Sequence, residues 1–263
     1  MSSLSPQLAE FSADWLKREP ALALCHRFAA KPTHWLASVV LVEELLQAMF
    51  ALSNHEVAQA KLAWWTDEAD LAVSGAPRHP LTQALCAARS NVRALPDLTR
   101  AACLWITLPT ASDSAQQRSQ LAAFAAAASE LIDESATAAI WTELALKRQL
   151  QNYAKPERYG PGVFSRAALA EFQLKASQIV EPTLASGAIA AQLNTIRLAL
   201  QSALQPRGSR GQSATRSYAL LQAREAGIWA KEAAALKVRF SATLPGLAGL
   251  LRAWWIARGR HAP

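Results

Sequence analysis

Residues 61–85 read KLAWWTDEADLAVSGAPRHPLTQAL and contain the signals that decide the fold. Apolar residues recur in the first half at the spacing of one helix face, and they are Leu62, Trp65, Ala69 and Ala72. Gly75 can end this helix in a left-handed conformation, and Pro77 disfavours its continuation. Pro80 suits the first turn of a second helix, because the amide proton that proline lacks has no acceptor there. The stretch therefore predicts two helices joined by a tight corner.

The whole chain has the composition of an all-α protein. Hydrophobic residues make up 51% of its 263 residues, and much of this share is alanine, the best helix former. Glycine and proline are few and cluster at expected helix ends, and alternating β-branched runs are missing. A chain of this length can bury a large core. We therefore expect one domain over residues 1–263, folded as an antiparallel helical bundle.

Capping residues and apolar spacing predict helices along most of the chain. Ser53 and Glu56 form a predicted capping box for the helix that contains the two tryptophans. The expected helices cover residues 6–18, 21–30, 32–53, 54–75, 81–92, 96–107, 114–153 (one helix, or two with a break near 135–137), 165–180, 181–204, 218–240 and 245–260. Residues 155–162 and 206–213 are expected loops.

The charge is uneven along the chain. Residues 1–200 contain 17 Lys/Arg and 18 Asp/Glu, whereas residues 201–263 contain 10 and 2, and the whole chain carries a net +7. The basic C-terminal region, residues 206–263, either binds an acidic partner such as a membrane surface or is a solvated face that aids solubility. Its tail around Trp254 and Trp255 suits an interfacial anchor or a last core helix. No nucleic-acid motif accompanies the charge, so we expect no nucleic-acid partner.

Three further observations bear on location. No uncharged apolar run reaches the roughly 18 residues of a membrane-spanning helix, and residues 1–20 lack the pattern of a secretory signal. Cys25, Cys86 and Cys103 are isolated and odd in number, which fits neither a disulfide framework nor a metal site. We expect a cytoplasmic protein that contacts the inner face of a membrane if its basic C-terminal region binds lipid.

The corner in residues 61–85 resembles a motif of the squalene/phytoene synthase superfamily. Members of that group carry a similar K-L-x-W-W-x-x-E and then G-x-P-x-H-P, and the matching residues here are Lys61, Leu62, Trp64, Trp65, Glu68, Gly75, Pro77, His79 and Pro80. The helix layout extends the resemblance over about residues 20–260. It implies a bundle of the isoprenoid synthase type and an enzyme that joins two prenyl diphosphates head to head.

That reaction needs a deep apolar cavity and Mg²⁺ to draw charge from the leaving diphosphate. The family holds the metal with two D-x-x-x-D motifs, whose spacing places both carboxylates on one helix face. In this chain the first motif falls on Phe50 and Asn54. At the second, Gln192 and Arg197 match the family, but Leu198 stands where an aspartate belongs. We therefore expect no cofactor, and Mg²⁺ only if other carboxylates replace the motifs.

Two acidic clusters are the candidates for such a replacement. Glu130, Asp133 and Glu134 share one face of a predicted helix, and Asp67, Glu68 and Asp70 form the second cluster. Either could contribute to a metal site if the two faced each other across a cavity. The competing interpretation, which we favour, is that both are solvated helix faces.

The resemblance also implies a set of pocket residues, which are Phe50, Asn54, Lys61, Trp64, Trp65, Gln192 and Arg197. The tryptophans either pack in the core or line a lipid-sized cavity. Arg207, Arg210 and Arg216 either hold a diphosphate or acidic headgroup or lie in a surface loop. His79 is expected to begin a helix rather than to act in catalysis.

We therefore predict a divergent squalene/phytoene synthase-like protein without catalytic activity. Some members of the group, including a mitochondrial complex I assembly factor, look similar in lacking the aspartates. This chain would bind an isoprenoid or other lipid, or serve as an assembly or helper factor for a partner protein. The alternative is an active prenyl transferase that condenses two prenyl diphosphates in isoprenoid biosynthesis, and a third hypothesis is a helical interaction protein with no ligand. The oligomeric state is left open.

Overall fold

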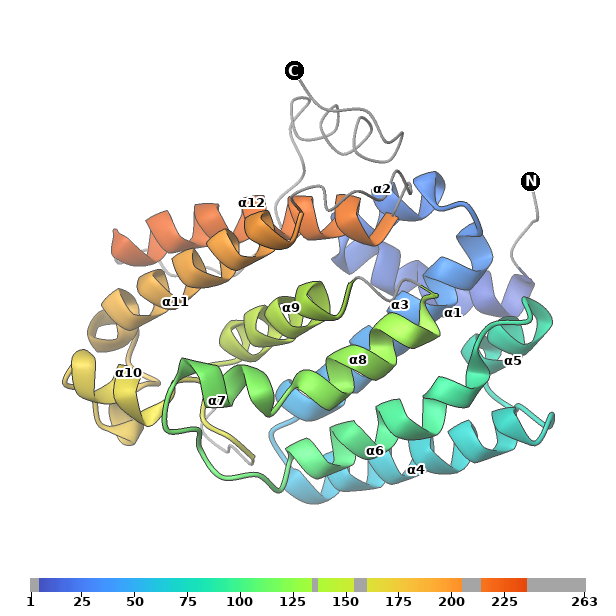
Figure 1. Cartoon of the computed structure of the whole chain (residues 1–263), viewed down its shortest axis with the longest axis horizontal. Coiled ribbons are helices and arrows are strands. Elements are labelled where there is room, and N and C mark those ends of the chain that lie inside the picture. Colours follow the sequence, from blue (N-terminus) through green and yellow to red (C-terminus); the bar gives the residue numbers. More distant parts are fainter. Residues whose placement is uncertain (1–4, 134–136, 154–159, 205–213, 236–263) are drawn as a thin grey trace.

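The computed structural model describes residues 5–133, 137–153, 160–204 and 214–235, and all regular secondary structure in these ranges is helical (Figure 1). The α-helices are α1 (Pro6–Arg18), α2 (Pro20–Cys25), α3 (Pro32–Phe50), α4 (His55–Val73), α5 (Pro80–Ala87), α6 (Leu95–Trp105), α7 (Ser114–Ser119), α8 (Ala122–Leu131), α9 (Ala138–Gln151), α10 (Arg166–Glu171), α11 (Pro182–Ala203) and α12 (Ala214–Ala234). Short 3₁₀ turns are η1 (His26–Phe28), η2 (Val92–Ala94) and η4 (Ala176–Gln178). The expected all-α class is confirmed.

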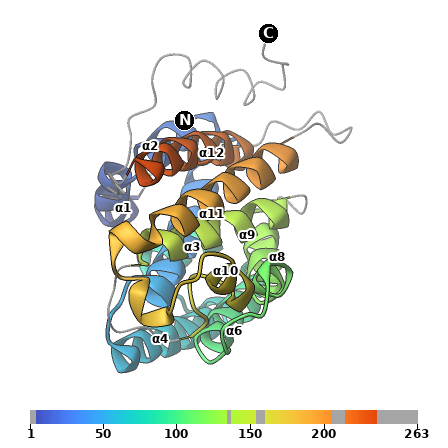
Figure 2. The same cartoon turned by 90° about the vertical axis from the view of Figure 1, so that its left-hand side faces the viewer.

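The helices form three levels around α3 (Figures 1 and 2). Helices α3, α8 and α9 make up the middle level, α11 packs along α12 on one side of it, and α4 packs along α6 on the other. Every residue of α3 from His34 to Phe50 is buried except Glu44 and Gln47, which are partly exposed. A helix that is apolar on all sides belongs in the interior. The prediction of a core helix here is confirmed.

Local signals explain several helix ends. The Ser5 side chain caps α1 by accepting from the Leu8 amide at 3.3 Å, and Pro6 and Pro80 occupy first turns as expected. Gly75 follows α4 with φ +84°, the left-handed conformation that glycine adopts without strain. The prediction of a capping box at Ser53 was wrong. Because α4 begins at His55, Asn54 is its cap and accepts from the amides of Glu56 and Val57.

Other helices end earlier than the sequence predicted, because residues other than glycine adopt positive φ. Arg89 (φ +54°) follows α5, Asp133 (φ +62°) follows α8, and Gln173 (φ +53°) follows α10. The amide of Ser90 then donates back to Leu85, and that of Leu174 to Leu169, which closes α5 and α10. The expected helices 81–92 and 165–180 are shortened accordingly.

The stretch 114–153 also differs from the prediction. Its described residues contain α7, α8 and α9, because a turn at Gln120 and Leu121 separates α7 from α8, and α8 ends at Leu131 before α9 begins at Ala138. Leu121 is buried, and α8 then packs against both α6 and α9. The break expected near 135–137 falls between α8 and α9, and residues 134–136 within it lie outside the described residues. So do most of the expected loop 155–162, the loop 206–213 and the expected helix 245–260.

Within the part of the chain that the structure describes, no helix combines the length and the apolar character needed to cross a membrane.

Candidate functional site

Glu68 holds the corner between α4 and α5 together. One of its carboxylate oxygens, Oε1, accepts hydrogen bonds from the backbone amides of Arg78 (2.8 Å) and His79 (2.9 Å) and from the hydroxyl of Thr82 (2.5 Å). Burial raises the pKa of Glu68, but these donors outweigh it and hold the pKa below its usual value. The prediction that this carboxylate belongs to a solvated face was wrong, because it is buried as an acceptor for the first turn of α5.

The two tryptophans of the motif have different environments. Trp65 is 2% exposed and belongs to the core, whereas Trp64 is 46% exposed. The ring of His79 meets Trp65 at 4.9 Å, Trp64 at 5.7 Å and Phe11 at 4.6 Å between centroids, all edge to face. His79 caps α5, because its Nδ1 accepts from the Leu81 amide at 3.2 Å. Burial lowers the pKa of His79, so the ring is neutral at neutral pH.

The residues at the position of the first metal motif have structural roles. Phe50 is buried and meets Trp105 edge to face at 4.7 Å between centroids, while Asn54 is exposed as the cap of α4. Lys61 pairs with Glu44 at 2.7 Å, and Glu44 also accepts from the indole of Trp15 at 2.7 Å. Neither Phe50 nor Asn54 supplies a carboxylate.

The residues of the second motif region lie on α11. Gln192 donates to Gln117 at 3.3 Å and to the Val163 carbonyl at 3.4 Å, and Arg197 bonds to Asn194 and Gln201 of its own helix. Leu198 is 55% exposed. Arg216 lies on α12 and not in a surface loop, and it donates to the Leu204 carbonyl at 3.5 Å, whereas Arg207 and Arg210 lie outside the described residues.

The acidic clusters do not converge on a metal site. Asp67, Asp70, Glu130 and Asp133 are exposed, and Glu134 lies outside the described residues. Glu130 accepts from Asn91, and Asp133 pairs with Lys31 at 3.8 Å. Within the described ranges, no group of three or more His, Cys, Asp or Glu side chains is arranged to hold a metal ion.

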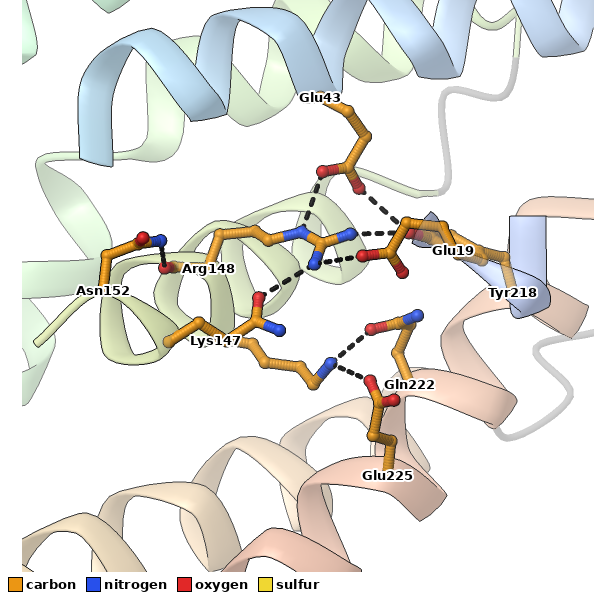
Figure 3. A network of polar contacts seen from close by, with 9 residues as sticks. Glu19, Glu43, Lys147, Arg148, Asn152, Tyr218, Gln222 and Glu225 are labelled. Atoms are coloured by element: carbon orange, nitrogen blue, oxygen red, sulfur yellow. Dashed lines mark hydrogen bonds and ion pairs between the residues drawn. The ribbon is translucent and has the colours of Figure 1, made fainter. Parts of the chain in front are cut away.

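The interior contains an ion network that the motifs did not indicate (Figure 3). The Arg148 guanidinium on α9 pairs with Glu19 at 2.6 Å and with Glu43 on α3 at 2.8 Å. The hydroxyl of Tyr218 on α12 donates to Glu43 at 2.9 Å and accepts from Arg148 at 3.3 Å. Arg148 also donates to the side chain of Gln151 at 2.9 Å. This network, called the Arg148 network below, joins α3, α9 and α12 to the start of α2.

Lys147 forms a second branch directly beside it. Its side chain is 1% exposed, and its ammonium group donates to Gln222 and Glu225 of α12, each at 2.5 Å (Figure 3). The same group lies 4.0 Å from the ring centre of Trp229. Cation–π contact and ion pairing both compensate the loss of water around this charge. Lys147 and Arg148, consecutive on α9, thus both contact α12, and Arg148 also contacts α3 and the start of α2.

The electrostatics favour an ionised network around Arg148. Burial raises the pKa of Glu19, but the attraction of Arg148 outweighs it, and the pKa lies below its usual value of 4.5. Burial, together with the charge of Glu43, raises the pKa of Tyr218 well above its usual value, so the phenol keeps its proton. Glu19 and Glu43 therefore share the single guanidinium of Arg148.

A pocket of about 260 Å³ that is open to solvent lies beside the Arg148 network. Its polar lining comes from Glu43, Gln47, Arg148, Gln151 and Asn152, and its apolar lining from Trp15, Leu46 and Ala51. None of the seven pocket residues implied by the resemblance lines it. Lys61 contacts one lining residue, Gln47, at 3.5 Å.

The sequence did contain a signal for the Arg148 network. Glu43 interrupts an otherwise apolar run in VVLVEELL, and the pair Lys147-Arg148 interrupts LALKRQL. A charge at a core position of a helix is almost never fully buried without a partner. The partners lie far apart in the sequence, by 105 residues for Glu43 and Arg148, so sequence spacing could not pair them.

Comparison of the sequence with models of known protein families and with curated proteins found no match.

Proposed function

We propose that this chain is a non-catalytic relative of the squalene/phytoene synthase-like group and acts as a binding or assembly factor. The observation that carries the proposal is the pairing of Glu19 and Glu43 with Arg148. Carboxylates that serve a hard cation such as Mg²⁺ must present oxygen atoms to it. These two instead bind a guanidinium in the interior of the bundle.

Recruiting these carboxylates to a metal would be costly. Removing Arg148 from two buried carboxylates, or leaving the guanidinium itself unpaired, costs several kcal/mol, about 3–5 for a buried pair. The network is therefore better suited to holding α3, α9 and α12 in place than to binding a metal diphosphate.

The positions of the lost aspartates support the same proposal. Phe50 fills space against Trp105, Asn54 is exposed as a helix cap, and Leu198 faces solvent at 55% exposure. The pocket beside Arg148 is also smaller than the roughly 300–1,000 Å³ of sites that bury a drug-sized ligand. Two prenyl diphosphates would need more room than this pocket offers.

The composition of the C-terminal quarter supports an anionic partner. With 10 Lys/Arg and 2 Asp/Glu in residues 201–263, this quarter carries a formal charge of +8. Basic segments are attracted to anionic lipid surfaces by about 1 kcal/mol per Lys or Arg near the surface. We include peripheral contact with an anionic membrane in the proposal.

The decisive experiment is incubation of the purified chain with farnesyl or geranylgeranyl diphosphate and Mg²⁺, with released diphosphate as the readout. An active squalene synthase is the positive control. We expect no release above the protein-free background. Release that requires both the protein and Mg²⁺, and stops when the metal is chelated, would overturn the proposal in favour of an active prenyl transferase.

Two measurements test the binding role itself. Native mass spectrometry of the purified chain identifies any lipid that travels with it, and a vesicle pelleting assay compares anionic with neutral lipid. We expect anionic vesicles to pellet the protein and neutral vesicles to leave it in solution, with the difference lost at high salt. Equal partitioning to both would contradict the membrane contact.

A further inference from the structure

The Arg148 network beside the pocket contains one more carboxylate than cations, and of its two carboxylates Glu43 lines the pocket while Glu19 lies on Arg148 next to it. Glu19 and Glu43 share one guanidinium, so one carboxylate charge is not compensated. Among the described residues, the neighbouring ion pairs of Lys61 with Glu44 and of Lys147 with Glu225 each match one cation with one carboxylate. The local excess of one negative charge therefore remains when these pairs are counted.

Two helix ends lie at the pocket. Ala51, which lines the pocket, directly follows the last residue of α3, and Asn152 directly follows the last residue of α9. The C-terminal end of a helix carries a partial negative charge from its unpaired carbonyl groups. The last turn of α3 contains no basic residue to offset it. The last turn of α9 contains Arg148, which offsets the end of that helix, so the end of α3 is the one that favours a cation at the pocket.

The remaining lining residues suit an organic cation better than an inorganic ion or an anion. Trp15 contributes an aromatic side chain, and aromatic rings attract ammonium and guanidinium groups. Gln47 and Gln151 bring amide groups to the pocket. Arg148 offers little to an anion, because it already donates to Glu19, Glu43, Gln151 and Tyr218.

We propose that this pocket binds a small organic cation of the alkyl diamine or guanidinium class. One positive group lies toward Glu43, at the buried end of the pocket, and the alkyl part contacts Trp15 and Leu46. The pocket volume of about 260 Å³ admits a molecule of this size. The inference goes beyond the binding or assembly role proposed above and does not rest on it.

Calorimetric titration with three probes of similar length tests the charge requirement. The probes are 1,4-diaminobutane, the neutral 1,4-butanediol and the anionic succinate. We expect binding of the diamine alone, and about tenfold or more weaker binding when NaCl is raised from about 50 to about 500 mM. Equal binding of the diamine and the diol, or no diamine binding at low salt, would overturn the proposal.

A pair of variants at the rim of the pocket tests its location. Ala51 is partly exposed at the end of α3, so Ala51→Lys can place an ammonium group in the pocket without disturbing the core. We expect Ala51→Lys to weaken diamine binding about tenfold or more, because its own charge takes the place of the ligand. Ala51→Met adds similar bulk without charge and should reduce binding far less. Unchanged binding by Ala51→Lys, or equal loss in both variants, would contradict a cation site here.

Discussion

The Nε atom of Arg148 lies 2.8 Å from Oε2 of Glu43, which links α9 to α3 across 105 residues of sequence. Glu43 is 2% exposed and Arg148 13% exposed as side chains, so little water reaches the pair. Arg148 lies between the carboxylate of Glu43 on α3 and that of Glu19, the residue before α2. The guanidinium is therefore a central polar contact in the interior of the protein.

Replacing Arg148 should destabilise the fold strongly. Arg148→Met leaves Glu19 and Glu43 buried without their cation, and we expect a loss of about 3–5 kcal/mol in the free energy of unfolding. Arg148→Lys should fall between this variant and the wild type, because a single ammonium group cannot reproduce the planar fork. Urea denaturation measures both. The control is Arg100→Met, which removes an exposed ion pair with Asp97 and should change stability by about 0.5 kcal/mol or less. Similar losses for Arg100→Met and Arg148→Met would contradict a structural role for the network.

Glu68 should matter for stability far more than its neighbour in the sequence. Glu68→Ala removes the acceptor for two backbone amides and the Thr82 hydroxyl, and we expect a loss of about 2–3 kcal/mol. Glu68→Gln keeps one side-chain oxygen and should lose less. Asp67→Ala is the matched control, because Asp67 is exposed. Thermal and urea unfolding give the comparison, and equal effects of the two alanine variants would show that the corner does not depend on this carboxylate.

Replacing Trp65 should lower the free energy of unfolding far more than replacing Trp64. Trp65→Ala leaves a cavity in the core and should cost about 3–5 kcal/mol, whereas Trp64→Ala should cost about 1 kcal/mol or less. The measurement is urea denaturation of both variants. If Trp65 instead lined an open lipid cavity, its replacement would be tolerated nearly as well as that of Trp64.

The free energy of unfolding should fall as the pH is lowered, because His79 takes up a proton more readily in the unfolded chain. Burial holds its pKa in the folded state below the usual value of 6.5, so the unfolded chain binds the proton first. The contribution of His79 is therefore present above about pH 6.5, and it is lost as the pH falls from there toward the folded pKa. His79→Asn keeps a capping acceptor for α5 but cannot titrate, so its profile should be flatter. Urea denaturation between about pH 5 and pH 8 tests this, and an NMR titration of His79 should give a midpoint below 6.5. A wild-type profile no steeper than that of His79→Asn would contradict it.

Two glycine substitutions should have opposite signs. Gly75 has φ +84°, so Gly75→Ala should cost about 1–2 kcal/mol from backbone strain alone, since nothing lies within 4 Å of the added Cβ. Gly187 is helical and exposed on α11, and an added Cβ would meet Phe172 at an ordinary 3.6 Å. Gly187→Ala should therefore stabilise the protein by about 0.4–1 kcal/mol. Melting temperatures of the two variants test the pair, and a destabilised Gly187→Ala would show that α11 is already strained there.

Much of the helical layout was accessible from local residue chemistry. Ser5 and Pro6 begin α1, Gly75 and Pro80 frame the corner after α4, and the apolar run after Trp35 identifies the core helix α3. Such signals act through the backbone of the residue itself or of its nearest neighbours, so they can be recognised in a linear chain. The early ends of α5 and α10 were missed, because Arg89 and Gln173 adopt a conformation that their residue types seldom take.

The roles of the buried polar residues could be assigned only from the folded structure. Whether Glu68 is a solvated acid or a buried cap follows from where the turn after Gly75 brings the amides of Arg78 and His79. Whether the buried acids face a cavity or a cation follows from Arg148, which reaches Glu43 only when α9 packs beside α3. Electrostatic interactions act through space and depend on burial, and neither quantity is encoded by separation along the chain. Residue types and their order were sufficient for an all-helical bundle, and only the packing of its helices paired the charges inside it.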